Sequence, residues 1–537
     1  MKRITKYFSQ ENSVRGASLL LIVTLAISNM LGLLRDRFLA KNLSFSDLDI
    51  YFASFRVSDT LFNFLILGAL VSAFLPIFTD FTTSRRTEEG FKLASIMINS
   101  SAIIMSLTAV IFYFIMPSVV GIIVPNFESA RFNETVAYSR LLMITPIFFS
   151  VAYVIGGILN SYKRFFAYSL SPLLYNLSII VGAVFLAPRY GITGVVYSVI
   201  AGSFLYFLIL IPALIKIDFK YYFILRPKDE TIKRITRLMI PRSVSLGASQ
   251  ILFTVFTSIG STISVGAIAA LNFANNIQTV PVVILGNSFA TAVFPVLAKK
   301  ISEGDNEGFS FYLNRAIRAI GFLMIPSSMV MILLRAQIVR LIIGTGKVDW
   351  DDTKMTALAL GFFAVSLISQ GLIPLLARAF FALKNTRLPM YSTIISVIVS
   401  IIFAYPLASN YSIVGLALAF SIGSFVQMFI LFYSLLTKYP SVFNPKLVGA
   451  YLKILVISLL MALATWGTMH GMAGIVDMSR YWGVLTQVLV SCVAAIIVYL
   501  GINFLIGSEE IKWAFKRRIN GGDEGSDRTK SGAEKRK

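Results

Sequence analysis

The chain is poor in the residues that most enzymes use for chemistry. Its 537 residues include one cysteine, Cys492, and one histidine, His470. A single cysteine excludes a disulfide within the chain and leaves no thiolate cluster for a metal ion. The sequence also contains no Ser-His-Asp set, no P-loop and no Gly-x-Gly-x-x-Gly turn before a helix. We therefore expect no enzyme activity, no metal site and no organic cofactor.

Charge is also scarce. Only 14% of the residues are charged and 56% are hydrophobic, where soluble domains carry about 25% charged residues. This composition predicts an all-α polytopic membrane protein. The formal net charge of +22 does not indicate a nucleic-acid partner, because the basic residues lie between apolar stretches and no binding module is present.

Apolar runs of about 20 residues mark helices that cross a bilayer. About fourteen such runs occur, and the first lacks a small-residue cleavage site, so we expect it to be retained. The expected spans are 16–40, 49–80, 93–117, 136–160, 168–187, 192–215, 241–262, 267–298, 312–334, 354–380, 388–408, 412–436, 447–469 and 481–507.

The basic residues predict the orientation. Most of the 48 Lys and Arg residues fall at the chain ends or in every second loop between the expected spans. Because short loops rich in Lys and Arg stay in the cytoplasm, we expect a bacterial cytoplasmic-membrane protein with both termini inside. The polar segment 508–537 is predicted to be a disordered cytoplasmic tail.

The two halves of the chain resemble each other. Residues 192–210 match 413–431 without a gap, at an offset of 221 (413 − 192). Weaker echoes join 67–78 to 285–297 and 160–164 to 383–387. Six spans in each half would give parallel repeats about an axis along the membrane normal, with a substrate site between them.

This repeat predicts the domain organisation. We expect two six-helix lobes, a linker that could form a helix on the cytoplasmic surface, two additional C-terminal helices and the tail. The corresponding residues are 1–215 and 241–437 for the lobes, 216–240 for the linker, 447–507 for the additional helices and 508–537 for the tail.

Polar residues share helix faces in the first two spans of each half. Asp49, Arg56 and Asn63 recur every seven residues, with Asp59 between them. The other members are Asn29, Arg35 and Asp36 in the first span, Gln250, Thr254, Thr257 and Ser261 in the seventh, and Asn272, Asn275 and Asn276 in the eighth. Ionisable groups at bilayer depth are costly and usually functional, so we expect these side chains to line a central cavity. Two structural alternatives stay open: the amides join helices, or the arginines pair with Asp36, Asp49 or Asp59.

A resemblance follows from these stretches. Residues 28–36 (SNMLGLLRD), 49–56 (DIYFASFR) and 68–76 resemble the MurJ (MviN) family of lipid II flippases, as do 160–165 and 294–295. The resemblance implies two six-helix lobes and a groove at the last two helices for a polyprenyl tail. It implies a lipid-linked oligosaccharide substrate, the bilayer as partner and a monomer. It also implies that arginines in the cavity grip the pyrophosphate, here Arg35 and Arg56. Asp36 and Asp49 match the acidic positions of the family pattern.

The chain departs from the family pattern at three cavity positions. Asn29 replaces the first motif arginine, Phe62 replaces another, and Asn276 ends the segment where the family has an arginine. The leading hypothesis is a lipid II flippase that works by alternating access. The alternatives are an exporter of another polyprenyl-linked oligosaccharide, such as an O-antigen unit, a cation-coupled drug exporter and a scaffold of the cell-wall machinery.

Overall fold

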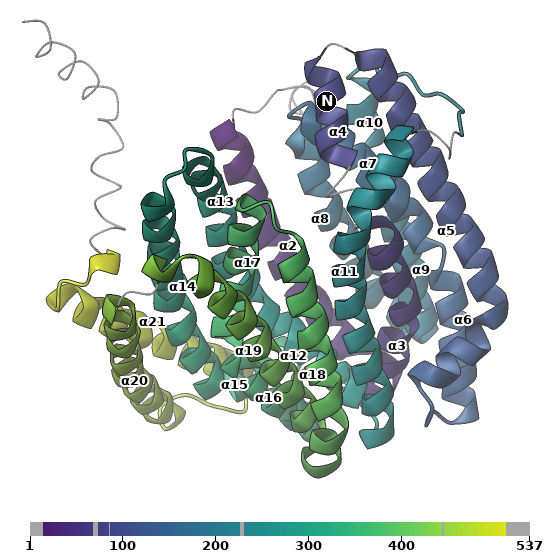
Figure 1. Ribbon diagram of the computed structural model, residues 1–537. Helices are drawn as coiled ribbons and strands as arrows, with labels where there is room; N and C mark the ends of the chain where they lie inside the picture. The colour runs from purple at the N-terminus through teal and green to yellow at the C-terminus, as the bar shows by residue number, and fades with distance from the viewer. Residues whose placement is uncertain (1–13, 68–73, 85, 226–229, 443–444, 512–537) are drawn as a thin grey trace, which may run out of the picture.

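The computed structural model describes residues 14–67, 74–84, 86–225, 230–442 and 445–511. Two helical bundles lie side by side (Figure 1). We call α2 to α10 the N-terminal lobe and α11 to α19 the C-terminal lobe. The end where α2 begins is called proximal, and the end where α2 meets α3 is called distal.

The N-terminal lobe is built almost entirely of helices joined by short connections. Its elements are α2 (Val14–Asn42), α3 (Phe45–Phe62), the π-helical η1 (Asn63–Leu67), α4 (Leu75–Thr83), α5 (Thr87–Ile123), α6 (Ser129–Leu142), α7 (Thr145–Ser161), α8 (Phe165–Val181), η3 (Gly182–Leu186), α9 (Ala187–Leu208) and α10 (Ile211–Ile215). The turn into α3 is set by a capping box, in which Ser44 and Asp47 bond each other's backbone N–H groups.

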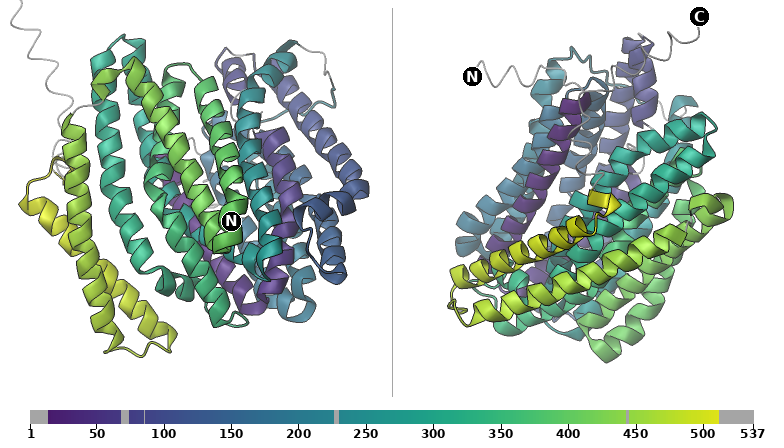
Figure 2. Two further views of the ribbon diagram at one scale, coloured as in Figure 1. Left: turned by 60° about the horizontal axis from the view of Figure 1, so that its bottom comes forward. Right: turned by 90° about the vertical axis from the view of Figure 1, so that its left-hand side faces the viewer.

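The C-terminal lobe follows the same order. Its elements are α11 (Glu230–Ile263), α12 (Ala267–Pro281), η4 (Val282–Asn287), α13 (Ser288–Ser302), α14 (Asn306–Leu333), α15 (Arg335–Ile342), α16 (Trp350–Val365), α17 (Leu367–Ala382), α18 (Arg387–Tyr411) and α19 (Ile413–Lys438). A 3₁₀ turn, η5 (Pro440–Val442), leads to α20 (Pro445–Ala473) and α21 (Tyr481–Leu505). This last pair packs on α14 and α15 at the outer edge of the C-terminal lobe (Figure 2).

The backbone carries the internal repeat. Gly191 and Ser412 have the same unusual dihedrals, φ 57° and ψ −139°, at an offset of 221 (412 − 191). Lys163 and Lys384 both have positive φ, 55° and 57°, again 221 residues apart (384 − 163). The structure therefore aligns the third sequence echo on this pair of lysines, two residues away from the alignment that the letters suggested.

The expected number of spans stays a prediction. Among the described residues, ten helices are long and apolar enough to cross a membrane, and eleven if the bent pair α16 and α17 counts as one span. One of these ten stretches, Phe165–Ile215, has 51 residues, which would measure about 77 Å as a single helix. It covers two expected spans, because the chain kinks at Gly191 and α8 packs against α9.

Two expectations for the connecting segments are corrected. Residues 219–225 of the linker have no regular secondary structure instead of forming a surface helix, and residues 230–240 already belong to α11. They lie along α5, where Ser95 accepts from Tyr222 N–H and the Asn99 amide donates to the carbonyls of Tyr222 and Ile224. These side chains satisfy backbone groups that a helix would have satisfied internally.

The start of the expected tail is ordered. Ser508 is buried, and Glu509 and Glu510 both form ion pairs with Arg318 of α14. The tail from 512 onward lies outside the described residues.

Candidate functional site

The lobes meet at the distal end through Asp49 of α3. Its carboxylate is 1% exposed and accepts from the backbone N–H groups of Gly266 (2.6 Å) and Ala269 (2.9 Å), at the start of α12 in the other lobe. Arg131 of α6 adds an ion pair at 3.1 Å. The carboxylate thus caps the positive end of a helix that belongs to the opposite lobe. We call these four residues the distal clamp.

Arg56 lies two turns further along α3 and also reaches across the interface. Its guanidinium donates to Thr257 Oγ1 of α11 (2.9 Å) and to Asn272 Oδ1 of α12. The side chain is 9% exposed and its partners are uncharged. The alternative that Arg56 pairs with Asp36, Asp49 or Asp59 is therefore wrong in this conformation.

Arg35 and Asp36 form the third contact between the lobes. Arg35 donates to Asp36 Oδ1 through two nitrogens (3.1 and 2.8 Å) and to Asn176 Oδ1 of α8 (3.2 Å). Asp36 is 1% exposed, and its second oxygen accepts from the Asn276 amide of α12 at 2.8 Å. Here the pairing alternative is confirmed. Arg35 nevertheless keeps 21% of its side chain exposed.

Three predicted site residues take no part in these contacts. Asn29 and Asn63 each donate to a carbonyl of their own helix one turn earlier. Asn275 accepts a hydrogen bond from the Gln278 amide, and Gln278 in turn accepts one from the Gln370 amide of α17. The Asn275 side chain therefore supports the inside of the C-terminal lobe, as the helix-joining alternative predicts.

Several functional positions escaped the sequence reasoning. Arg131 and Asn176 hold predicted site residues, yet each lies in a helix for which the sequence indicated no polar face. Thr257, which accepts from Arg56, belongs to the polar face predicted for the seventh span. Gly266 and Ala269 act through backbone N–H groups, which leave no trace in a sequence. The described residues contain no group of three or more His, Cys, Asp or Glu that could hold a metal.

The interface is asymmetric along its length. On one side α11 packs against α3, η1 and α5 of the N-terminal lobe. On the other side α2 packs mainly on α8 of its own lobe and meets α12 and α15. Its residues Leu39 and Ala40 are fully buried at the distal end, whereas Val23, Leu25 and Ile27 are 44–46% exposed. The two lobes are thus fastened at the distal end, and α2 becomes uncovered towards the proximal end.

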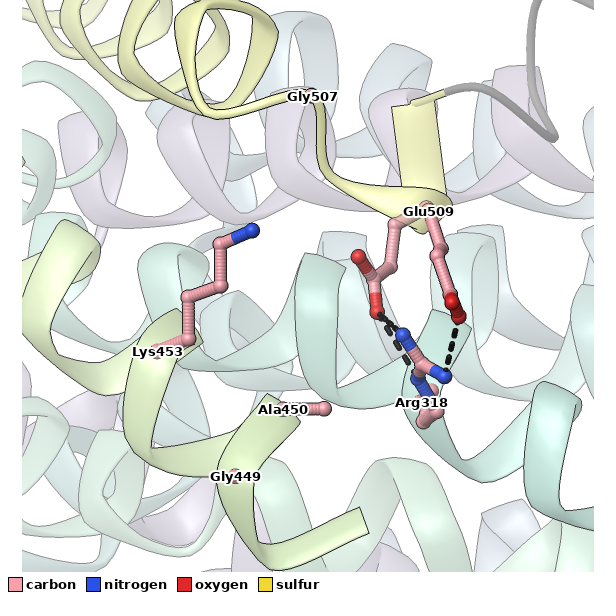
Figure 3. Close-up of a pocket in the computed structure, with 7 residues that line it drawn as sticks. Arg318, Gly449, Ala450, Lys453, Gly507 and Glu509 are labelled. Atoms are coloured by element: carbon pink, nitrogen blue, oxygen red, sulfur yellow. Dashed lines mark hydrogen bonds and ion pairs between the residues drawn. The ribbon is translucent and has the colours of Figure 1, made fainter. Parts of the chain in front are cut away.

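A separate polar pocket of about 310 Å³ lies away from the lobe interface, between α14, α20 and the end of α21. Figure 3 shows Lys453 on one wall and the Arg318–Glu509 ion pair on the other. None of the predicted site residues lines it. It is therefore distinct from the charged contacts between the lobes.

Two repeated helical lobes joined by buried charges define a membrane transporter of the kind that moves its lobes against each other. Residues 44–486 match the sequence model of the family described as Lipid II flippase MurJ. The chain belongs to this family.

Individual relatives agree with this assignment. The chain is 25% identical over 517 residues to the Lipid II flippase MurJ of Burkholderia cenocepacia, covering 92% of this chain and 96% of the relative. It is 29% identical to the Lipid II flippase MurJ of Thermosipho africanus, with coverage of 79% and 86%.

Solved structures show the same fold. A structure titled "Lipid II flippase MurJ, inward closed conformation" superposes with a TM-score of 0.75 at 25% identity, covering 91% of this chain and 99% of that chain. An inward-facing multidrug resistance MATE transporter of the MOP superfamily superposes with a TM-score of 0.68 at 16% identity, covering 79% and 98%. At that identity the likeness concerns the fold alone.

Proposed function

We propose that this protein moves lipid II, an undecaprenyl-pyrophosphate-linked disaccharide-pentapeptide, from the inner to the outer leaflet for peptidoglycan synthesis. Membership of the MurJ family supports this cargo. The observation that carries the mechanism is that Arg35 bonds Asp36, which in turn accepts from Asn276 across the lobe interface. It places a partly exposed arginine side chain where the two lobes meet.

The conformation described above corresponds to the inward-facing state in this proposal. The distal clamp closes the outer end, and the inner end admits the headgroup from the cytoplasm. Arg35 grips the pyrophosphate, because a guanidinium can donate two parallel bonds to phosphate oxygens. Arg56 holds the lobes together in this state and becomes available to the cargo only when Thr257 and Asn272 withdraw. Asn272 and Asn276 supply amides for sugar or peptide groups.

The remaining parts of the chain have supporting roles in this proposal. The pair α20 and α21 guides the polyprenyl tail along the C-terminal lobe, on which it packs. The protein works as a monomer in the bacterial cytoplasmic membrane, with both termini in the cytoplasm, as the basic loops predict.

A second cargo is favoured by one observation. Asn29, Phe62 and Asn276 occupy positions where the family resemblance implies arginine, so the site is less cationic than the family pattern. A polyprenyl-linked oligosaccharide other than lipid II would use the same lobes and the same tail groove.

The test is replacement of the resident flippase in a depleted bacterium, with lipid II translocation measured directly by external access to the headgroup. We expect the wild-type chain and Arg37→Ala to restore growth and translocation, and Arg35→Ala to fail at equal membrane abundance. Arg37 is the matched control, because it lies two residues away and reaches the C-terminal half only through the Leu341 carbonyl and the Tyr481 ring, with no bond to Asp36 or Asn276. Failure of the wild-type chain would contradict the lipid II proposal. Growth supported by Arg35→Ala would favour the scaffold alternative.

A further inference from the structure

Asp59 differs from the other carboxylates of the lobe interface. It lies one turn beyond Arg56 on α3 and is exposed, although its neighbours Val57 and Ser58 are 4% and 2% exposed. Asp36 and Asp49 are each 1% exposed and bonded on both oxygens. Within the described part of the chain, the Asp59 carboxylate has no hydrogen-bonding or ion-pairing partner.

The surroundings of Asp59 belong to the interior of the protein. Arg56 and Arg35 act on it electrostatically, and it acts in turn on Tyr51 and Tyr175, so the groups around it come from α2, α3 and α8. On its other side, the next residue, Thr60, meets Thr254 of α11 at 3.4 Å between hydroxyl oxygens. An unpaired carboxylate is too costly in hydrocarbon, so this exposed group faces water between the lobes.

We propose that Asp59 is a subsite for a monovalent cation beside the anion-binding arginines. The proposal rests on the proposed function. Arg35 and Arg56 suit the pyrophosphate of the cargo, and neither shares an ion pair with Asp59 that would use up its charge. A carboxylate accepts charge-assisted hydrogen bonds from an ammonium group or coordinates an inorganic ion. The cation comes either from a primary amine on the peptide of the cargo or from a free ion such as Na⁺.

The two sources are separated by a binding experiment on the full-length protein in detergent. The probes are lipid II with a lysine-containing peptide and the same lipid with that lysine acetylated. Each is titrated in sodium chloride and in choline chloride, and the Kd is measured by thermophoresis. The variant is Asp59→Asn. The matched control is Asp47→Asn, which removes a carboxylate from the same helix whose bond stays within the N-terminal lobe.

If the cargo supplies the cation, the wild-type protein binds the free amine about tenfold more tightly than the acetylated form in both salts. Asp59→Asn then binds both forms equally, and Asp47→Asn behaves as wild type. If a free ion supplies it, both lipids bind more tightly in sodium than in choline, and Asp59→Asn removes that difference.

The inference is overturned if Asp59→Asn matches the wild type within twofold for both lipids in both salts. It is also overturned if the wild type distinguishes neither the amine nor the salt. Absence of lipid II binding by the wild-type protein would instead contradict the proposed function itself. In that case the tail-matched oligosaccharide lipids become the probes, and the same comparison of Asp59→Asn with Asp47→Asn decides the cation subsite.

Discussion

The distal clamp makes a quantitative prediction for Asp49→Asn. The carboxylate caps two N–H groups at the start of α12 and pairs with Arg131. Losing a helix cap costs about 0.5–2 kcal/mol, and losing a charge at a partly buried helix terminus costs up to about 2 kcal/mol. Because asparagine keeps one acceptor oxygen, we expect a total of about 2–3 kcal/mol. The bonds to α12 exist only while the lobes are closed at this end, so the equilibrium should shift roughly 30- to 150-fold towards opening there.

Distances between spin labels test this shift. Cysteines replace Ser129 and Lys347, which are exposed on opposite lobes, in the full-length protein carrying Cys492→Ser and reconstituted in vesicles. We expect a longer-distance population to grow in Asp49→Asn. Asp47→Asn should match the parent protein, because Asp47 bonds Ser44 within its own lobe. An unchanged distance distribution in Asp49→Asn would refute the reasoning, since the clamp would then contribute nothing to closure.

Three further predictions concern the repeat, the start of the tail and the interface. Ser412→Gly should raise the free energy of unfolding by about 1 kcal/mol and Gly191→Ser should lower it by about the same amount, because φ 57° with ψ −139° suits only glycine. The melting temperatures measured by calorimetry should therefore shift in opposite directions, and shifts of the same sign would contradict this. Glu510→Gln should lower the melting temperature more than Glu509→Gln, since the side chains are 9% and 77% exposed and exposed pairs contribute less than about 1 kcal/mol. Arg56→Lys loses one of two charged hydrogen bonds across the interface, worth about 1.5–3 kcal/mol, and should increase distal opening at least tenfold in the same distance measurement. An opening equal to that of the parent would show that a lysine ammonium can replace both bonds of the guanidinium.

The sequence predicted the parts of this protein that depend on periodicity. Apolar length gave the helices, and the offset of 221 residues anticipated the matched backbone at Gly191 and Ser412. The heptad spacing of Asp49 and Arg56 predicted that both lie on one face of α3, and in the structure both side chains bond the other lobe from that face. These features follow from local geometry, which a single sequence specifies.

The pairing of charges did not follow from the sequence. Arg56 chose Thr257 and Asn272 over the nearby Asp59, a choice that depends on how α11 and α12 are rotated and tilted against α3. A single sequence does not indicate which side chains meet when their helices lie some 200 residues apart in the chain. The prediction of a helix in the linker was wrong for a related reason. The backbone of residues 222–224 is held by Ser95 and Asn99 of α5, which lie far from it in the chain.

The packing of α11 against α3, η1 and α5 has a consequence for how a tailed molecule could cross. A rocking motion that preserves this long contact uses it as the rotation axis. The gap between the lobes then widens only on the opposite side, along α2. The opening then faces the lipid in one direction. In the proposed mechanism, a headgroup passes between the lobes while its hydrocarbon chain stays outside, in the bilayer.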